Sequence, residues 1–399
     1  MPRVLVVNTG SSSIKYQLFD MPDGSGEAKA LASGVVERIG EAGSKLTHRA
    51  GDAEPLVVEE RVADHSDGFE RIFKAFEATG GPITDLAGIG HRVVHGGDRL
   101  TAPTLVDDAA IQAIADQAPL APLHNPSNLL GIRIAMASFP ETPQVAVFDT
   151  AFHQTMPARA YRYALPAELA RDLRIRRYGF HGTSHAYVAR KAAEHLGRPA
   201  AEVNLVTLHL GNGASVAAVA GGRCVDTSMG LTPLEGLVMG TRSGDLDPAV
   251  VFYLHREAGL SIDDIDDLLN KRSGMLGLAG ANDMREVDRR AADGDQAAVE
   301  ALDVYCYRIR KYVGAYTAAL GRLDALVFTA GVGENNQGVR AGVCAGLEGL
   351  GIELDPKRNK GRSSRPRTIS ADDTPVAVLV VPTNEELEIA EQTMAVVRG

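Results

Sequence analysis

The chain has 399 residues, of which 45% are hydrophobic and 23% charged, and this composition is typical of a folded globular protein with roughly two to three domains. The net charge of −10 argues against a nucleic-acid partner, because binding a phosphate backbone requires a basic face. The three cysteines have no metal-like spacing, the chain starts directly with a strand pattern, and no apolar run approaches the ~20 residues of a membrane span. We therefore expect a cytoplasmic protein with no membrane or nucleic-acid partner.

The N-terminal residues predict a β-hairpin with a polar tip. An apolar strand at 4–7 and a second strand at 14–20 flank Asn8-Thr9-Gly10-Ser11-Ser12-Ser13, a turn of small polar residues. Further strands are predicted within 31–62. Residues 67–79 have aromatic and apolar side chains at helical spacing, which predicts an amphipathic helix whose stripe belongs to the core.

A short apolar strand follows at 89–97, and it carries Arg92. A charged side chain inside such a strand requires a partner, so Arg92 is either a structural ion pair or a planar donor for a carboxylate or phosphate. We favour the second role because Gly96 and Gly97 open the backbone beside it. Helices are predicted at 106–118 and 127–138, joined by a proline-rich loop. Asp149 ends the next buried strand, where a catalytic carboxylate and a helix cap are equally compatible with the pattern.

The segment 174–185 is dense in polar residues. His181 and His185 have the i, i+4 spacing of zinc-binding helices, but no glutamate follows the first histidine, and Gly182 favours a loop there. Ser184 is predicted to cap a helix that ends near Leu196. We favour a histidine that donates to a charged oxygen over a metal site.

The most informative stretch is 203–219, because it repeats the N-terminal pattern of strand, small polar turn and strand. Gly211 and Gly213 allow a tight turn whose backbone N–H groups can bind phosphate oxygens. Neither hairpin fits the P-loop or the dinucleotide fingerprint, so two facing tips would grip a polyphosphate in another way. A third relative, 325–335, is predicted as a buried strand that runs into a glycine-rich loop.

Three glycine-flanked polar clusters occupy 226–245, and loops of this kind commonly carry function. Arg242 lies in the last of them and is a second candidate anion ligand, the alternative being an ordinary surface arginine. Helices are predicted at 247–258, 262–270 and 297–320, a strand at 377–381, and a terminal helix from Glu385. Strands alternate with helices on both sides of the central hairpin, which predicts two similar α/β lobes with a first crossover near 152–159.

Seven motifs in order resemble those of the acetate kinase family, which belongs to the superfamily of acetate and sugar kinases, Hsp70 and actin. They are the segments 8–15, 90–97, 180–185, 209–213, 239–245, 331–335 and 383–386, and they span the whole chain. Thr9 departs from the family, which often has alanine there. The resemblance implies two ribonuclease-H-like βββαβα lobes with a nucleotide cleft between them. It divides the chain into an N-terminal acyl lobe of 1–151 plus 385–399 and a nucleotide-binding lobe of 152–384.

The resemblance also implies a homodimer that catalyses reversible Mg²⁺-dependent phosphoryl transfer between ATP and acetate, giving acetyl phosphate and ADP. Mn²⁺ is an alternative metal. The residues that it implies fall into four groups. Asp149, His181, Arg242 and Arg92 would be catalytic, with Arg92 also binding the acyl group beside Val94, Leu123, Phe180 and Pro233. Asn8 and Glu385 would serve the metal. The nucleotide site would comprise Lys15, His209, Leu210, Gly211, Asn212, Gly213, Asp283, Met284, Arg285, Gly331, Val332, Gly333, Glu334 and Asn335.

Three other readings of the sequence compete with this one. A kinase for propionate or butyrate would differ only in its acyl pocket, where one methylene is worth about 1–3 kcal/mol. An ATPase of the same superfamily would require neither Arg92 and Arg242 nor a small apolar pocket. A metallohydrolase built on His181 and His185 lacks a convincing third ligand.

Overall fold

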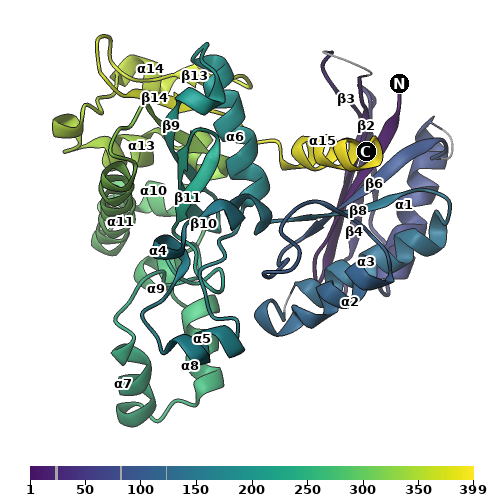
Figure 1. Ribbon diagram of the computed structural model, residues 1–399, viewed down its shortest axis with the longest axis horizontal. Helices are drawn as coiled ribbons and strands as arrows, with labels where there is room; N and C mark the ends of the chain where they lie inside the picture. The colour runs from purple at the N-terminus through teal and green to yellow at the C-terminus, as the bar shows by residue number, and fades with distance from the viewer. Residues whose placement is uncertain (23–25, 81–82, 123) are drawn as a thin grey trace. The chain divides into compact units, whose positions relative to one another are not determined.

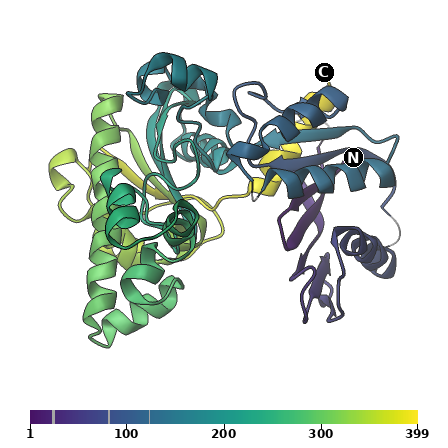
Figure 2. The same cartoon turned by 90° about the horizontal axis from the view of Figure 1, so that it is seen from below.

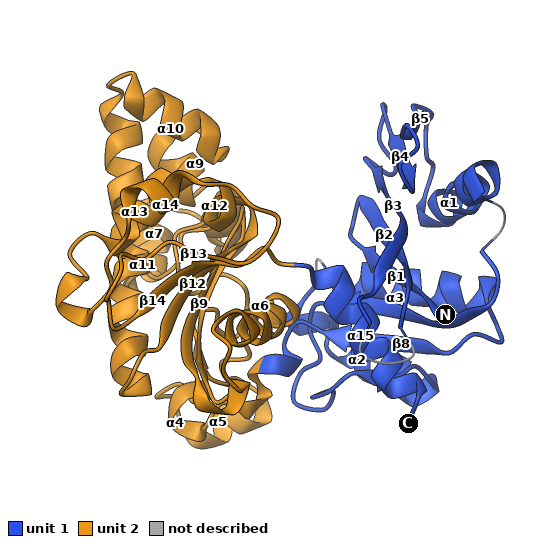
Figure 3. Ribbon diagram, turned by 90° about the horizontal axis from the view of Figure 1, so that it is seen from above, with its two compact units in different colours: residues 1–152, 384–399 blue, residues 153–383 orange. Residues whose placement is uncertain are grey.

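The computed structural model describes residues 1–22, 26–80, 83–122 and 124–399 and divides the chain into two compact units. Unit 1 comprises Met1–Phe152 and Asn384–Gly399, and unit 2 comprises His153–Thr383 (Figure 3). Each unit contains one sheet with helices packed against it (Figure 1). Leu123, a predicted acyl-pocket residue, lies outside the described residues. No helix in the described part of the chain combines the length and apolarity needed to cross a membrane.

The sheet of unit 1 has eight strands in the order β5-β4-β3-β2-β1-β6-β8-β7. These strands are β1 (Arg3–Thr9), β2 (Ser13–Asp20), β3 (Lys29–Glu37), β4 (Lys45–Ala50), β5 (Leu56–Val58), β6 (Leu86–Val93), β7 (Thr104–Leu105) and β8 (Gln144–Phe148). The strands β1 to β5 form an antiparallel meander, and β6 and β8 then add in parallel to β1. The predicted N-terminal hairpin and the strands within 31–62 are confirmed.

Helices cover both faces of this sheet because the residues of β1 alternate in the face to which they point. Leu5 and Val7 pack in the cluster that contains the predicted aromatic stripe of α1 (His65–Gly80). Val4 and Val6 pack instead with the terminal helix α15 (Glu385–Val397). The helices α2 (Asp108–Asp116) and α3 (Asn125–Ser138) pack in a third cluster with β6 and β8. The short 3-10 helices of this unit span Ala118–Leu120 and, at its border, Ala151–Thr155.

The sheet of unit 2 has the order β11-β10-β9-β12-β14-β13. Its strands are β9 (Asn204–Leu210), β10 (Ala214–Ala220), β11 (Arg223–Thr227), β12 (Ala325–Thr329), β13 (Arg367–Thr368) and β14 (Ala377–Val380). The antiparallel meander β9-β10-β11 is followed by β12 and β14, which run parallel to β9. The series β3-β2-β1-β6-β8 of unit 1 therefore has the same pattern as β11-β10-β9-β12-β14, and the prediction of two similar α/β lobes is confirmed.

The helices of unit 2 include α11, which is the longest in the chain with 25 residues and runs along one flank of the unit (Figure 2). In chain order the helices are α4 (Ala158–Tyr161), α5 (Ala167–Asp172), α6 (Gly182–His195), α7 (Ala249–Glu257), α8 (Ile262–Lys271), α9 (Gly274–Ala279), α10 (Met284–Ala292), α11 (Gln296–Leu320), α12 (Ala330–Asn335), α13 (Gln337–Cys344) and α14 (Pro356–Lys360), with 3-10 turns at Ala200–Glu202 and Glu348–Leu350.

Three local predictions were wrong. The glycine-rich segment after β12 is the helix α12 and not a loop, because Ala330 takes a left-handed φ of 63° that turns the chain directly from strand into helix. The helix α6 begins at Gly182 and not at Ser184, because His181 rather than Ser184 occupies its N-cap position. The helix α3 begins at Asn125, within the segment predicted as a loop, because proline is favoured in a first helical turn.

Candidate active site

The tip of the β1–β2 hairpin is closed by a bond from the Gly10 backbone N–H to the Ser13 carbonyl, at 2.8 Å. Asn8 and Lys15 face each other in the ladder just before this tip, so both predicted side chains belong to the same end of the hairpin. The helix α3 packs against this end so closely that a methyl group on Gly131 would lie 2.1 Å from Thr9 Oγ1. The packing of α3 therefore holds the hairpin tip in place.

Arg92 and Asp149 form a bidentate ion pair at the carboxyl ends of β6 and β8. Arg92 Nε donates to Oδ1 at 2.9 Å and Nη2 donates to Oδ2 at 2.7 Å. The Asp149 side chain is 2% exposed and that of Arg92 is 24% exposed, so part of the arginine side chain remains accessible. Asp149 is thus the ion-pair partner of Arg92, a role that the sequence analysis did not assign to it.

The electrostatics of this pair favour an orienting role for the carboxylate. Burial raises the pKa of Asp149 above its usual value, and the positive charge of Arg92 opposes that rise. Burial disfavours the charged form of Arg92, but Asp149 and, more weakly, Glu385 and Glu386 raise its pKa overall. The guanidinium consequently stays charged, with its remaining N–H groups available to an anion.

The strand end beyond Arg92 is fixed by two asparagines of α3. Asn128 accepts from the Val94 backbone N–H at 3.1 Å and donates to the Thr9 carbonyl at 2.7 Å. Asn125 binds the backbone of His95 in the same two-sided way. Val94, a predicted acyl-pocket residue, is 8% exposed. These asparagines connect the hairpin tip with the segment that follows Arg92, and the sequence alone assigned them no role.

In unit 2, His181 occupies the N-cap position of α6 with a left-handed φ of 57°, a conformation that is uncommon outside glycine and often marks functional sites. Its ring stacks on that of His209, the penultimate residue of β9, with ring centres 4.1 Å apart. A methyl group placed on Gly213 would lie 2.8 Å from Arg242 Nη2 and 3.4 Å from His181 Nε2. The two predicted cationic or donor groups thus face the same point beside the β9–β10 turn.

Arg242 carries its charge without a carboxylate partner among the described residues. Its Nη1 donates to the Pro233 carbonyl at 2.7 Å, and burial lowers the pKa of its guanidinium. A half-buried cation loses part of its hydration, and a bound anion would compensate for that loss. The alternative of an ordinary surface arginine is therefore not supported by its surroundings.

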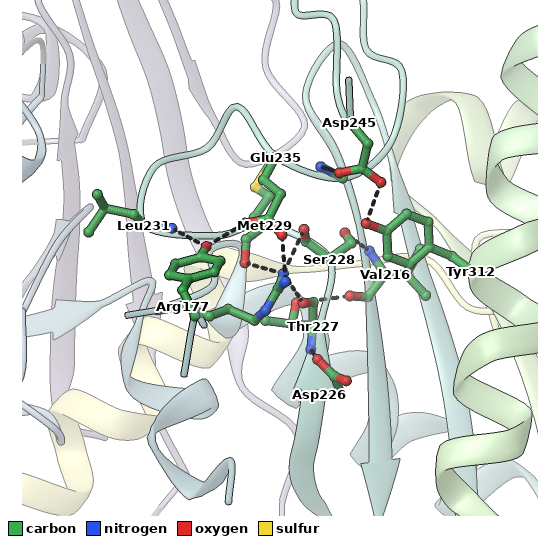
Figure 4. A network of polar contacts seen from close by, with 12 residues as sticks. Arg177, Val216, Asp226, Thr227, Ser228, Met229, Leu231, Glu235, Asp245 and Tyr312 are labelled. Atoms are coloured by element: carbon green, nitrogen blue, oxygen red, sulfur yellow. Dashed lines mark hydrogen bonds and ion pairs between the residues drawn. The ribbon is translucent and has the colours of Figure 1, made fainter. Parts of the chain in front are cut away.

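The long irregular segment that carries Pro233 and Arg242 is held by a buried polar network (Figure 4). Arg177 Nη1 donates to the carbonyls of residues 227, 228 and 229, and its Nη2 donates to Glu235 at 2.5 Å. Glu235 also accepts from Tyr163. Further along the segment, Asp245 accepts from Tyr312 at 2.7 Å. These bonds replace the regular secondary structure that would otherwise fix Arg242.

A cavity of about 910 Å³ in unit 2 gathers residues from three predicted nucleotide segments. Its lining includes Gly211, Asn212, Asp283, Met284, Arg285, Gly331, Val332 and Asn335. The other predicted nucleotide residues of this unit, namely His209, Leu210, Gly213, Gly333 and Glu334, are absent from the described lining. Lys15 lies on unit 1. The cavity's size suits a ligand as large as a nucleotide, since small-molecule sites typically occupy about 300–1,000 Å³.

The walls of this cavity also contain groups that the sequence analysis missed. Asn336 caps α13 and donates to Asp288 at 2.5 Å, and both residues line the cavity. Arg340 is 1% exposed and donates to the carbonyls of Gly333 and Glu334, both at 2.9 Å. These two bonds fix the backbone of the predicted glycine-rich segment, which is now α12. Its only signal in the sequence is a cation within an otherwise apolar helical stretch.

The described residues do not support a zinc site at His181 and His185. Both ring nitrogens of His185 are engaged, Nδ1 with Thr207 Oγ1 at 2.7 Å and Nε2 with Ser215 Oγ at 2.8 Å. No cluster of three or more potential metal ligands occurs among the His, Cys, Asp and Glu residues that the structure describes. The i, i+4 spacing serves a hydrogen-bond network instead.

Known proteins resemble this chain over its whole length. The model of the acetokinase family matches residues 3–391. The chain belongs to the acetokinase family. An acetate kinase of Streptomyces griseus is 60% identical over 99% of this chain and 96% of its own length, and that of Nitratidesulfovibrio vulgaris is 53% identical over 99% of this chain and 100% of its own length.

Solved structures extend the likeness to the fold of this acetokinase-family chain. A Porphyromonas gingivalis acetate kinase matches with a TM-score of 0.93 and 44% identity, covering 99% of this chain and 100% of its own. A propionate kinase from Francisella tularensis matches with a TM-score of 0.92 and 42% identity, again covering 99% and 100%. The predicted fold class, α/β with two ribonuclease-H-like lobes in the actin-like ATPase architecture, is thereby confirmed.

Proposed function

We propose that this protein is an acetate kinase that transfers a phosphoryl group reversibly between ATP and acetate. The observation that carries the proposal is Arg242, a half-buried cation without a carboxylate partner among the described residues, which shares the space beside Gly213 with His181. Such a pair of donors suits the charge of a transferring phosphoryl group, whose stabilisation is most of the protein's task in this chemistry.

The proposed reaction assigns a task to each group. A carboxylate oxygen of acetate attacks the γ-phosphorus of ATP, the bond from that phosphorus to the bridging oxygen breaks, and ADP leaves as acetyl phosphate forms. Acetate is already a nucleophile, so no strong base is needed. Arg92 would bind the acetate carboxylate, Asp149 would orient Arg92, and Arg242 and His181 would neutralise the charge of the group in transfer.

Unit 1 is accordingly proposed as the acyl side and unit 2 as the nucleotide side. The cavity lined by Gly211, Asp283 and Gly331 would hold ATP or ADP. As the family resemblance implies, Lys15 is proposed as a further nucleotide ligand, and Val94, Leu123, Phe180 and Pro233 are proposed as contacts of the methyl group of the acid. The small size of acetate is consistent with side chains as bulky as valine and phenylalanine at these positions.

Mg²⁺ is the proposed metal, with Mn²⁺ as an alternative. Asn8 and Glu385 offer hard oxygen ligands, which fit Mg²⁺, and a bound Mg²⁺ characteristically keeps several waters and shares the phosphates of the nucleotide. When bound, the metal would neutralise charge on those phosphates. Two protein ligands are therefore sufficient for a metal that arrives with its nucleotide.

A homodimer in the cytoplasm is the proposed state. Apolar side chains with about half or more of their surface exposed occur on or beside α5, α7 and α8, among them Leu173, Phe252, Tyr253 and Ile262. Exposed apolar side chains of this kind often mark a protein interface. The described cysteines are free and buried, which fits a reducing compartment. Light scattering of the purified protein should give twice the chain mass of 42.2 kDa.

A kinase for propionate is the second candidate, because the Francisella tularensis structure with 42% identity is titled a propionate kinase. The two functions share the fold and mechanism and differ only in the acyl pocket. A third possibility, an ATPase of the same superfamily, would hydrolyse ATP without any added acid.

One assay separates these candidates. Purified protein with ATP and Mg²⁺ is given acetate, propionate or butyrate, and the acyl phosphate is trapped with hydroxylamine. The strongest signal with acetate supports the proposal. A stronger signal with a longer acid reassigns the substrate, and steady ATP hydrolysis with no acyl phosphate contradicts a carboxylate kinase altogether.

A further inference from the structure

Ser215 lies between two histidines of α6. Its Oγ is 2.9 Å from His181 Nδ1 and 2.8 Å from His185 Nε2. Ser215 pairs with His209 across the β9–β10 ladder, and Thr207 pairs with Ala217, so Ser215 and Thr207 point to the same face of the sheet. The helix α6 covers this face, and its i, i+4 spacing directs both histidines onto one hydroxyl group.

The contacts continue from His185 to Thr207, whose Oγ1 is 2.7 Å from His185 Nδ1. The side chains of Thr207, His185 and Ser215 are fully buried. Burial, with smaller effects of His153 and His209, holds the pKa of His185 well below its usual value, so the ring is neutral and carries one N–H. A neutral ring donates at one nitrogen and accepts at the other, which makes the row of bonds directional.

The direction follows from the partners of Thr207. The Thr207 hydroxyl has two acceptors within reach, His185 Nδ1 at 2.7 Å and the Ala217 carbonyl at 3.5 Å, which is the limit for a hydrogen bond. The short bond to His185 Nδ1 is therefore the favoured arrangement. With Thr207 donating to His185 Nδ1, the His185 proton is on Nε2 and donates to Ser215. The Ser215 hydroxyl then donates to His181 Nδ1. The remaining proton of a neutral His181 must then be on Nε2.

We propose that Thr207, His185 and Ser215 form a positioning relay that fixes the ring of His181 and keeps its proton on Nε2. That nitrogen faces the same point beside Gly213 as Arg242 Nη2. The relay lets His181 donate a hydrogen bond to a phosphoryl oxygen while the ring is uncharged. The value of this donor for catalysis rests on the proposed function, whereas the proton position does not.

The first test observes the proton directly. In protein labelled with ¹⁵N-histidine, with His181 assigned from the signals that vanish in His181→Asn, the neutral ring should show an unprotonated Nδ1 and a protonated Nε2. Thr207→Val should move the His181 signals toward a mixture of tautomers, although Thr207 does not touch that ring. Unchanged signals in this variant, or a parent ring protonated at Nδ1, would overturn the relay.

The second test compares catalysis in a double-mutant cycle. Ser215→Ala should lower kcat by about 10- to 100-fold with little change in the KM for ATP, the scale expected when a catalytic group loses its orientation. In a His181→Ala background the same change should alter kcat less than about twofold, because residues that act as one unit are non-additive. Equal losses in both backgrounds would mean that Ser215 acts independently of His181.

A matched control is available in unit 1, on the helix α15. Thr393 Oγ1 is also fully buried and donates to the Ile389 carbonyl at 2.7 Å, so Thr393→Val removes one buried hydroxyl bond outside the relay and outside the network that holds Arg242. It should leave kcat and the His181 signals unchanged, and a loss equal to that of Ser215→Ala would assign both effects to general destabilisation. If the parent protein forms no acyl phosphate, the proposed function fails, while the proton position is still decided by the ¹⁵N signals.

Discussion

At the scale of single residues, Arg92 and Arg242 differ in what they have as partners. Arg92 is paired with Asp149 and keeps free donors, whereas Arg242 has only a backbone carbonyl among the described residues. Replacing either by alanine should lower kcat by about 100-fold or more, the loss typical of one transition-state donor. Steady-state acyl phosphate formation measures this loss. Near-normal kcat in both variants would remove both residues from the proposed mechanism.

A lysine at these positions provides the control for charge. Lysine restores the positive charge but not the planar, bidentate geometry with which Arg92 holds Asp149. We expect Arg92→Lys to recover only a small part of the activity lost in Arg92→Ala. Full recovery would show that charge alone, and not geometry, is required.

Val94 provides a test of the acyl pocket. If it borders the methyl group of acetate, Val94→Ala should make room for a longer chain and raise the butyrate-to-acetate ratio of kcat/KM about 10-fold, because one methylene is worth roughly 1–3 kcal/mol in a pocket. Hydroxamate formation with both acids gives the ratio directly. A ratio equal to that of the parent would exclude Val94 from the pocket wall.

At the scale of elements, the segment that carries Arg242 depends on Arg177. This arginine is 16% exposed, and its removal would leave Glu235 and three carbonyls without their donor. We expect Arg177→Met to lower the free energy of unfolding by about 3 kcal/mol, the scale for breaking a buried pair, and to reduce kcat as Arg242 loses its position. Urea unfolding and kcat are the measurements.

Arg171 supplies the comparison for this prediction. It pairs with Asp172 on the surface, with 72% of its side chain exposed. Arg171→Met should therefore change the unfolding free energy by less than about 0.5 kcal/mol. Similar losses in the two variants would show that the network around Arg177 contributes nothing beyond an ordinary surface pair.

The regular elements could largely be predicted from the sequence, because their periodicity is local. The aromatic stripe of α1, the duplicated hairpins and the strand that precedes Asp149 all follow from the local sequence pattern. The helix α12 could not be predicted, because its glycines favour a loop. The left-handed backbone of Ala330, which turns the chain into the helix, is not apparent from the sequence.

The site divides in the same way. Arg92 and Arg242 could be predicted from the sequence, because Arg92 lies within an apolar strand pattern and Arg242 lies within a glycine-flanked polar cluster. The supporting bonds of Arg177 could not be predicted, because they join groups distant in the chain; Arg177 binds the carbonyl of residue 228, which is 51 positions away. The role of Ser215 likewise depends on the packing of α6 on the sheet.

At the scale of the whole molecule, buried neutral histidines make stability depend on pH. Burial lowers the pKa of His91 and of His153 to about 4, against 6.5 in an unfolded chain. Between pH 6.5 and 4 these two histidines therefore bind protons in the unfolded chain but stay neutral in the folded protein. Each histidine should remove up to about 3 kcal/mol of stability as the pH falls through this range, and none above pH 7.

Chemical unfolding at several pH values measures this dependence. His91→Gln retains a partner for Gln144, which now bonds to His91 Nε2 at 2.8 Å, and removes the titrating ring. The variant should show a shallower loss of stability between pH 6.5 and 4 and the same slope as the parent above pH 7. Identical slopes throughout would contradict a neutral, buried His91.

The discontinuous make-up of unit 1 has a consequence for how the protein is synthesised. The helix α15, which follows unit 2 in the chain, covers one face of the unit 1 sheet, where a methyl group on Gly90 would lie 2.3 Å from Thr393 Oγ1. Unit 2 is continuous in sequence, so all of its residues emerge before α15. Chains usually complete their N-terminal domain first during translation. Here one apolar face of the nascent N-terminal sheet stays uncovered until unit 2 has been synthesised and α15 has emerged.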